Sequence, residues 1–163
     1  MTVKEYNTAV DDFADNIYRF VLKHLKNVDA TKDVVQDTFA KVWVKHKNIS
    51  AQKVKSYLFT TAYNTLIDVL RKEKYNEDIE QLDKHFNQRA TKNIDLQEIL
   101  HSALNQLPEI QKTVILLRDY EGYDYAEIGK ITHLKESQVK VYIFRARKKL
   151  KQILVSVEAV LEV

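Results

Sequence analysis

Scarcity of glycine and proline most constrains how this chain can fold, because it has only two glycines and one proline in 163 residues. Tight turns between strands and phosphate-binding loops both depend on glycine, which adopts backbone conformations closed to other residues. The absence of cysteine also excludes a disulfide framework, a thiolate zinc site and a cysteine nucleophile. The sequence therefore predicts an all-α protein and excludes several enzyme classes.

The composition is that of a folded, helix-rich protein. Hydrophobic residues make up 45% of the chain and charged residues 30%, which is unlike a disordered chain. No apolar run approaches the roughly 18 residues that a membrane-spanning helix needs. Residues 1–12 lack the basic-then-apolar layout of a signal peptide. We therefore expect a cytoplasmic protein without a membrane span.

Three amphipathic helices are predicted in the first half of the chain. Apolar residues recur at the helical period over about 11–26. Asp29 stands where the N-cap of a second helix is expected, and that helix should end near Lys47. A third helix is predicted from about residue 53 to residue 74. Its buried stripe should comprise Phe59, Tyr63, Leu66, Ile67 and Leu70.

Residues 76–94 are polar and weakly periodic, which predicts a flexible linker. The segment carries a net negative charge, whereas residues 1–75 and 96–163 each carry a net positive charge. Two basic regions on either side of an acidic segment suggest a polyanionic partner that the chain touches at two places.

A second helical domain is predicted after the linker. Asp95 can cap a helix over 96–107, and Pro108 suits the first turn of a helix that continues to about Tyr120. Gly122 fits the left-handed backbone position that follows such a helix.

A helix-turn-helix motif is the strongest functional signal in the residues themselves. Asp124 and Glu127 have the spacing of a capping box and open a short helix to about Ile131. A turn over 132–135 follows, and a long basic helix begins near Glu136. The start of such a second helix meets base edges in the major groove. The candidates for base edges are Glu136, Ser137, Gln138, Lys140, Val141 and Tyr142, and those for phosphates are Arg145, Lys148 and Lys149.

Both nucleic-acid signals have a simpler alternative. The basic helix face can be only a solvated surface. The third predicted helix interleaves aromatic residues with cations, a pattern that suits unstacked single-stranded bases, but an aromatic core with a solvated basic rim is favoured by the pattern alone. Phe59 and Tyr63 lie on the core stripe, so Tyr57 is the exposed candidate for stacking.

No group of residues suggests catalysis or metal binding. The five histidines lack metal-binding spacing, and no Ser, His and Asp grouping has the logic of a hydrolase. Asp11, Asp12 and Asp15 are better placed to complement a helix dipole than to act as acids or bases. We expect no enzymatic activity, no metal site and no cofactor.

Two parts of the chain together resemble a known family. Residues 27–46 (NVDATKDVVQDTFAKVWVKH) and 54–74 (VKSYLFTTAYNTLIDVLRKEK) form the first part, and residues 103–154, with the helix-turn-helix, form the second. In this order they resemble the extracytoplasmic-function sigma factors of bacterial RNA polymerase, within the sigma-70 family. The resemblance implies a sigma-2-like helical bundle over 1–75 and a sigma-4-like helix-turn-helix domain over 95–163.

The resemblance assigns two surfaces to the first domain. One helix would dock on the β′ clamp helices of core RNA polymerase, and its matching residues are Asp33, Gln36, Asp37, Phe39 and Trp43. Trp43 is explained equally well as a core residue. The loop over 47–53 and the next helix would open the −10 promoter element and hold a flipped base. The matching residues are Lys47, Asn48, Lys53, Tyr57, Asn64, Arg71 and Lys72, and Asp68 is expected to pair with Arg71 or Lys72.

The second domain would recognise the −35 element, with three departures from the family pattern. His133 replaces a frequent glycine, Lys135 replaces a capping Ser or Thr, and Val141 and Tyr142 replace a common Ser-Arg pair. An arginine can form a bidentate pair with guanine and a tyrosine cannot. We therefore expect an altered −35 preference.

The resemblance implies a sigma factor whose partners are core RNA polymerase (β′ clamp helices and β flap) and promoter DNA. Such a protein would be cytoplasmic and associated with the nucleoid through the polymerase, and an anti-sigma factor is a further expected partner. The main alternative is a stand-alone helix-turn-helix regulator that binds duplex DNA as a dimer. A second is a helical interaction protein with an incidental basic face. The apolar C-terminal tail would pack on its own domain or on a partner, through Ile153, Leu154, Val155, Val157, Val160 and Leu161.

Overall fold

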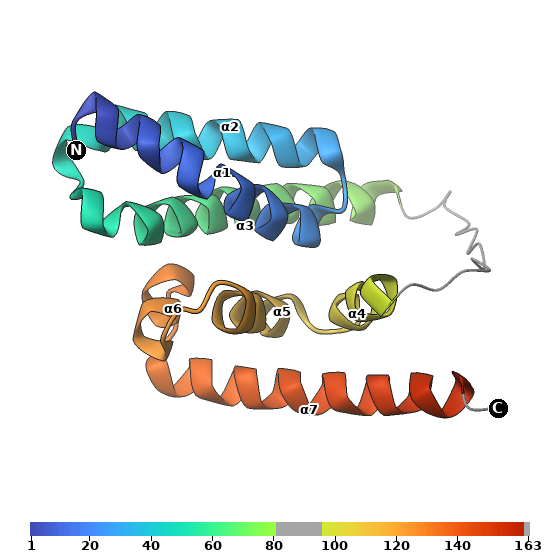
Figure 1. Cartoon of the computed structure of the whole chain (residues 1–163). Helices are drawn as coiled ribbons and strands as arrows, with labels where there is room; N and C mark the ends of the chain where they lie inside the picture. The colour runs from blue at the N-terminus through green and yellow to red at the C-terminus, as the bar shows by residue number, and fades with distance from the viewer. Residues whose placement is uncertain (81–95, 162–163) are drawn as a thin grey trace. The chain divides into compact units, whose positions relative to one another are not determined.

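The computed structural model describes residues 1–80 and 96–161, and every regular element in these ranges is a helix (Figure 1). Contacts divide the chain into two compact units, residues 1–85 and 86–163. The predicted all-α class is confirmed. Within the described ranges no helix is both long and apolar enough to cross a membrane, and no three His, Asp or Glu side chains gather as metal ligands would.

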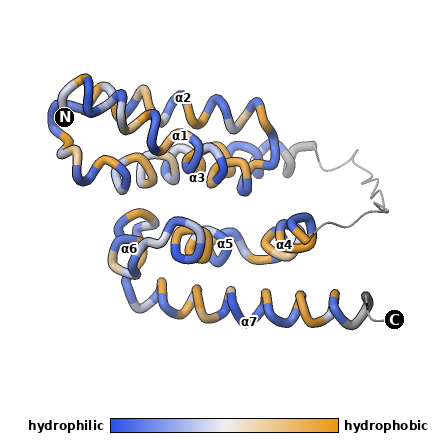
Figure 2. The backbone as a smooth tube through the Cα atoms, in the orientation of Figure 1, coloured by the Kyte–Doolittle hydropathy of each residue, from blue (hydrophilic) through white to orange (hydrophobic). Residues whose placement is uncertain are grey.

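The first unit is a bundle of α1 (Val3–Leu25), α2 (Val28–Lys45) and α3 (Val54–Glu80), each packed against the other two (Figure 1). Two short 3₁₀ turns, η1 (His46–Asn48) and η2 (Ala51–Lys53), connect α2 to α3. Along each helix, hydrophobic residues recur between hydrophilic ones, as expected for the predicted amphipathic helices (Figure 2).

The structure corrects the predicted starts of two helices. α1 begins at Val3 rather than near residue 11, because Thr2 and Glu5 form a capping box. α2 is capped by Asn27, whose side chain accepts a hydrogen bond from the Ala30 amide, and not by Asp29, which lies in the first turn. The left-handed backbone of Lys26 (φ 57°) ends α1 and makes this turn tight enough for Asn27 to cap.

α3 differs from its prediction in both length and buried face. It continues to Glu80, past the predicted end near Lys74, so the first residues of the predicted linker 76–94 are helical, and residues 81–94 lie outside the described residues. Its core positions include Leu58 and Ala62 as well as the predicted Phe59, Tyr63 and Leu66, whereas Ile67 and Leu70 are only half-buried. The stripe is broader than expected because α3 packs on two helices at once.

The second unit consists of α4 (Leu96–Asn105), α5 (Glu109–Ile115), the π-helical turn η3 (Leu116–Tyr120), α6 (Tyr125–Thr132) and α7 (Glu136–Leu161). α7 packs against α4, α5 and α6. The core at these contacts comprises Leu104, Val114, Leu117, Ile128, Ile131, Val139, Ile143 and Ala146.

Several predicted boundaries in this unit shift by a residue or two. α4 ends at Asn105 rather than Leu107, and Pro108 is the N-cap of α5 rather than part of its first turn. The helix predicted to reach Tyr120 widens into a π turn after Ile115. Gly122 has the predicted left-handed backbone, with φ 75°. The predicted cap Asp95 lies outside the described residues.

The apolar tail of α7 lies partly against its own unit. Ile153 and Val157 are half-buried and line a groove of about 320 Å³ opposite Ile99 and Ala103 of α4. Val155 is 55% exposed. The tail therefore covers part of α4 and leaves an apolar edge uncovered.

Candidate functional site

The outer face of α2 carries the polar residues predicted to bind the polymerase. Asp33, Gln36 and Asp37 are all exposed and lie on adjacent turns of one face. Ala40 and Val44 continue that face, and Val44 is 81% exposed. Val44 was not among the predicted residues, although its position two turns after Asp37 places it on the same face. The face combines exposed carboxylate and amide groups with an uncovered apolar side chain.

Phe39 and Trp43 lie on the flank of α2 that turns toward α1. The Phe39 carbonyl accepts a hydrogen bond of 2.9 Å from the Tyr6 hydroxyl, and burial raises the pKa of the Tyr6 phenol. The Trp43 ring packs edge-on against the Tyr6 ring, with 4.9 Å between the ring centroids, and stacks on the His46 ring, with 4.2 Å between centroids. Trp43 is nevertheless 41% exposed. Trp43 is thus neither a purely core residue nor a free surface residue.

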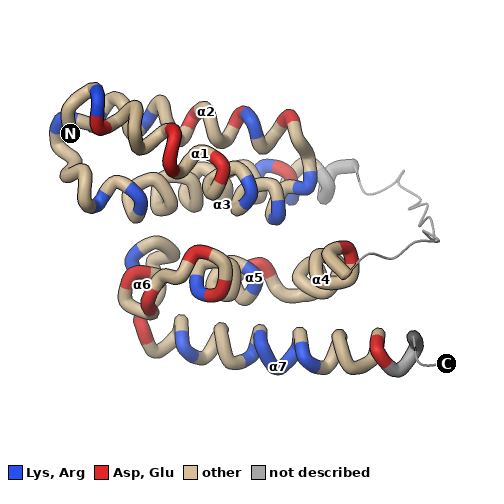
Figure 3. The backbone as a smooth tube through the Cα atoms, in the orientation of Figure 1, with Lys and Arg blue, Asp and Glu red and all other residues tan. Residues whose placement is uncertain are grey.

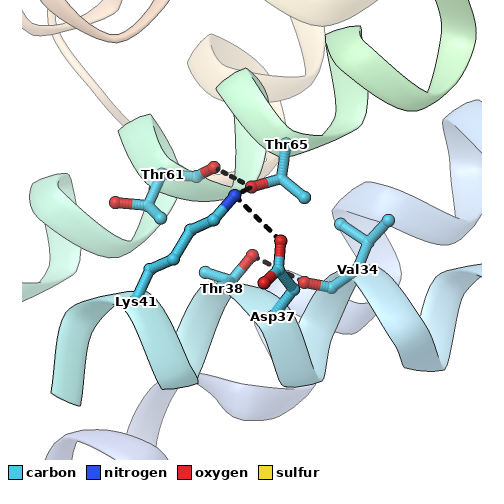
Figure 4. A network of polar contacts seen from close by, with 6 residues as sticks. All are labelled: Val34, Asp37, Thr38, Lys41, Thr61 and Thr65. Carbon is cyan, nitrogen blue, oxygen red and sulfur yellow. Dashed lines mark hydrogen bonds and ion pairs between the residues drawn. The ribbon is translucent and has the colours of Figure 1, made fainter. Parts of the chain in front are cut away.

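A polar network joins α2 to α3 beside this face (Figure 4). The Lys41 ammonium lies 2.8 Å from an Asp37 carboxylate oxygen and donates a 3.1 Å hydrogen bond to the Thr65 hydroxyl. The Thr65 hydroxyl donates in turn to the Thr61 carbonyl at 2.8 Å. Asp37 is therefore already paired within the unit, and Lys41 is a contact that the sequence analysis missed.

The predicted −10 loop contains the two 3₁₀ turns rather than irregular backbone. Lys47, Asn48 and Lys53 are exposed on these turns. Ile49 anchors the segment in the core. The amino group of Met1 donates to the carbonyls of His46 and Ile49, at 2.9 and 2.7 Å. The loop is thus held by an apolar anchor and two hydrogen bonds.

One face of α3 brings together three predicted −10 residues. Tyr57, Asn64 and Arg71 lie two helical turns apart in succession and so share a face. Tyr57 is half-buried rather than fully exposed, while Asn64, Arg71 and the adjacent Lys72 are exposed. The predicted pairing of Asp68 is wrong, because within residues 1–80 it forms no ion pair with Arg71 or Lys72 and is exposed.

The helix-turn-helix is formed by α6 and α7. Asp124 caps α6 by accepting a 2.8 Å hydrogen bond from the Glu127 amide, as predicted. α6 includes Thr132, so the turn is shorter than expected, and His133 adopts a left-handed backbone with φ 61°. The Lys135 amide donates to the Gln138 side-chain oxygen at 3.0 Å. This bond is the half of a capping box that the side chain at the third helical position supplies, and the Lys135 side chain has no oxygen to supply the other half.

The structure exposes all but one of the predicted DNA-binding residues of α7. Tyr142 is half-buried, and the others, Glu136, Ser137, Gln138, Lys140, Val141, Arg145, Lys148 and Lys149, are exposed. Lys140 lies 3.8 Å from a Glu136 carboxylate oxygen, so each partly neutralises the other. Figure 3 shows the basic residues following one another along α7.

A basic groove of about 510 Å³ lies beside α7, lined by Tyr125, Lys140, Ile143, Phe144, Arg147, Lys148 and Lys151. Phe144 is 69% exposed. Arg147 is 2.7 Å from an Asp119 carboxylate oxygen, and this hydrogen bond raises the pKa of its guanidinium. Phe144, Arg147 and Lys151 were not among the predicted site residues, although all three lie on the predicted basic helix.

Comparison with known families matches both units. The model of sigma-70 region 2 matches residues 9–75, and that of sigma-70 region 4 matches residues 97–150. The RNA polymerase sigma factor SigV of Bacillus subtilis (strain 168) is 30% identical over 142 residues, covering 86% of each chain. The ECF RNA polymerase sigma factor SigM of the same strain is 27% identical over 146 residues, covering 86% of this chain and 90% of its own.

Together, the bundle, the helix-turn-helix and these matches define a two-region transcription initiation factor. The chain belongs to the sigma-70 family, in its extracytoplasmic-function group, and is an RNA polymerase sigma factor. The alternative of a stand-alone dimeric regulator is not favoured, because it does not account for the match to sigma-70 region 2.

Solved structures show the same fold. The sigma factor RpoE of Bartonella quintana, in complex with the anti-sigma factor NepR, has a TM-score of 0.78 and 23% identity over 93% of this chain and 98% of its own. CnrH, in complex with the cytosolic domain of CnrY, has a TM-score of 0.68 and 20% identity over 93% of this chain and 88% of its own.

Proposed function

We propose that residues 1–75 bind core RNA polymerase and the −10 element, and that residues 95–163 bind the −35 element. The observation that carries this division is one chain with a region 2 bundle followed by a region 4 helix-turn-helix, each with its own charged surface. The protein acts by binding, without catalysis, in the cytoplasm, and reaches the nucleoid through the polymerase.

The outer face of α2 is the docking surface for the β′ clamp helices. Its carboxylates, Asp33 and Asp37, suit a basic partner. Gln36 adds hydrogen-bonding groups, and Val44 and the exposed part of Trp43 add apolar area that docking would cover.

The −10 element is held by the loop residues Lys47, Asn48 and Lys53 and by the Tyr57–Asn64–Arg71 face of α3, with Lys72 beside it. The half-exposed Tyr57 ring offers a stacking surface for an unpaired base. Exposed cations at both ends of this surface suit the phosphates of one strand.

The −35 element is recognised by the start of α7, while Arg145, Lys148 and Lys149 bind phosphates. The β flap and an anti-sigma factor are further partners. Two structural neighbours, RpoE and CnrH, were solved with NepR and with the cytosolic domain of CnrY. That likeness supports a similar inhibitor for this chain.

The decisive experiment is co-elution of the chain with sigma-free bacterial core RNA polymerase on a sizing column. We expect a stoichiometric complex, which then selects promoters from random-sequence DNA. Asp33→Arg on the docking face should abolish co-elution, and Asp11→Arg on the exposed face of α1 is the matched control. Tight duplex binding by the chain alone, without a polymerase complex, would instead indicate the dimeric regulator.

A further inference from the structure

Lys41 connects the docking helix α2 to the −10 helix α3. Its ammonium bonds an Asp37 carboxylate oxygen on its own helix at 2.8 Å and the Thr65 hydroxyl on α3 at 3.1 Å (Figure 4). Thr65 is buried, and its own proton is donated to the Thr61 carbonyl. The Thr65 oxygen is therefore fixed as an acceptor for Lys41.

This position places the Lys41 ammonium at the border of the proposed −10 surface. Thr61 lies one helical turn after Tyr57 and one turn before Asn64, so it belongs to the same side of α3. The Lys41 side chain is 50% exposed. A phosphate of a strand lying along Tyr57 and Asn64 would find this cation next to α3.

Another cation can replace Lys41 in its ion pair with Asp37. The Asp37 side chain is 49% exposed, and ion pairs between exposed side chains contribute little to stability. The docking face also presents Asp33, which forms no ion pair within the described residues. A basic side chain attracted to this face would compete with Lys41 for Asp37.

We propose that Lys41 binds a phosphate of the melted promoter strand, and that Asp37 positions and restrains it until a cation of the polymerase takes its place. This inference rests on the proposed function of region 2. Polymerase docking and capture of the −10 strand are then coupled through one lysine.

The test uses the full chain, free and in holoenzyme, and a single-stranded oligonucleotide covering the −10 region of a promoter selected by the holoenzyme. Lys41→Met removes the cation, Asp37→Asn removes its restraint, and Lys32→Met is the control on another exposed lysine of α2. Affinity is measured over a series of salt concentrations, and binding to core polymerase is measured separately. Circular dichroism checks the fold, and Lys41→Gln, which can still bond Thr65, replaces Lys41→Met if that variant is unstable.

For the holoenzyme, Lys41→Met should reduce the slope of log affinity against log salt by about 0.7, the value for one phosphate on a single strand. Its binding to core polymerase should change less than about twofold. For the free chain, Asp37→Asn should raise DNA affinity severalfold, and adding Lys41→Met should remove that gain. Lys32→Met should leave the slope unchanged.

An unchanged slope for Lys41→Met would refute the phosphate contact. An unchanged free-chain affinity for Asp37→Asn would refute the restraint, and loss of core binding by Lys41→Met would place Lys41 in the docking surface instead. If the wild-type chain failed to bind core polymerase, the proposed function would fall first, before any variant is compared.

Discussion

The two glycines of this chain are required for different reasons, and substituting each tests the geometry of the helix-turn-helix. A Cβ at Gly129 in α6 would lie 2.7 Å from the Leu134 carbonyl oxygen, in the turn before α7. A Cβ at Gly122 would meet nothing within 4 Å, but its backbone has φ 75°. Glycine is therefore required at position 129 because a larger side chain would not fit, and at position 122 because of the backbone conformation.

Two opposing contributions determine whether Gly129→Ala raises or lowers the free energy of unfolding. Alanine in a helix interior is favoured over glycine by about 1 kcal/mol. Overpacking costs about 1–3 kcal/mol, and the upper end applies because the obstacle is backbone, held in place by the 3.0 Å bond from the Leu134 amide to the Gly129 carbonyl. We expect a net loss of about 2 kcal/mol. Gly122→Ala should cost about 1 kcal/mol through its left-handed backbone, and Gly122→Asn less, because asparagine tolerates that region.

Chemical unfolding of the full chain provides the assay. Far-ultraviolet circular dichroism follows both units, whereas the single tryptophan, Trp43, reports only the first. Gly129→Ala should shift the circular-dichroism transition of the second unit to lower denaturant and leave the Trp43 transition unchanged. A variant as stable as the wild type, or more stable, would show that the Leu134 carbonyl moves away at no cost, and the steric argument would be wrong.

Three further predictions concern the second unit. Neutralising Arg145, Lys148 or Lys149 singly should each lower the salt slope of holoenzyme binding to duplex −35 DNA by about 0.9, and a constant slope would remove these residues from the phosphate contacts. Tyr142→Arg should change the preferred −35 sequence, because a bidentate pair with guanine discriminates by about 1–3 kcal/mol. Identical binding across a panel of mutated promoters would contradict this. Asp124→Ala should lower the free energy of unfolding by about 1 kcal/mol through loss of the N-cap, whereas Asp124→Asn should retain most of it in the same denaturation assay.

The apolar pattern predicted where helices lie, but not where they begin. The first turns of α1, from Val3 to Thr8, are mostly exposed and carry little apolar periodicity. Only the capping chemistry of Thr2 and Glu5 marks that start, and it is visible in the sequence as a threonine followed three positions later by a glutamate. The error at Asp29 has the same origin, since two residues capable of capping stand close together and only the backbone of Lys26 selects Asn27.

The candidate site shows a similar limit. Residues of α2 could be assigned from a resemblance, and those of α7 from the helix-turn-helix pattern, because both sets belong to continuous motifs. The bond between Lys41 and Thr65 joins residues that are 24 positions apart, and no spacing rule connects them. The contact of Gly129 with the turn likewise depends on how α7 returns toward α6. Such contacts follow from packing, which a single sequence does not specify.

The three departures from the family pattern in the helix-turn-helix separate into two kinds once the geometry is known. His133 supplies the left-handed backbone where glycine is frequent, at a cost of about 1–2 kcal/mol. With lysine at position 135, the capping hydrogen bond of α7 comes from the Gln138 side chain, which accepts from the Lys135 amide. Both of these departures lie in the turn between α6 and α7 and affect its local structure. The Gln138 side-chain oxygen accepts that hydrogen bond, so the side-chain NH₂ group of Gln138 is left to bind a base edge. An altered −35 preference must therefore come chiefly from Val141 and Tyr142, which lie on α7 beyond the turn.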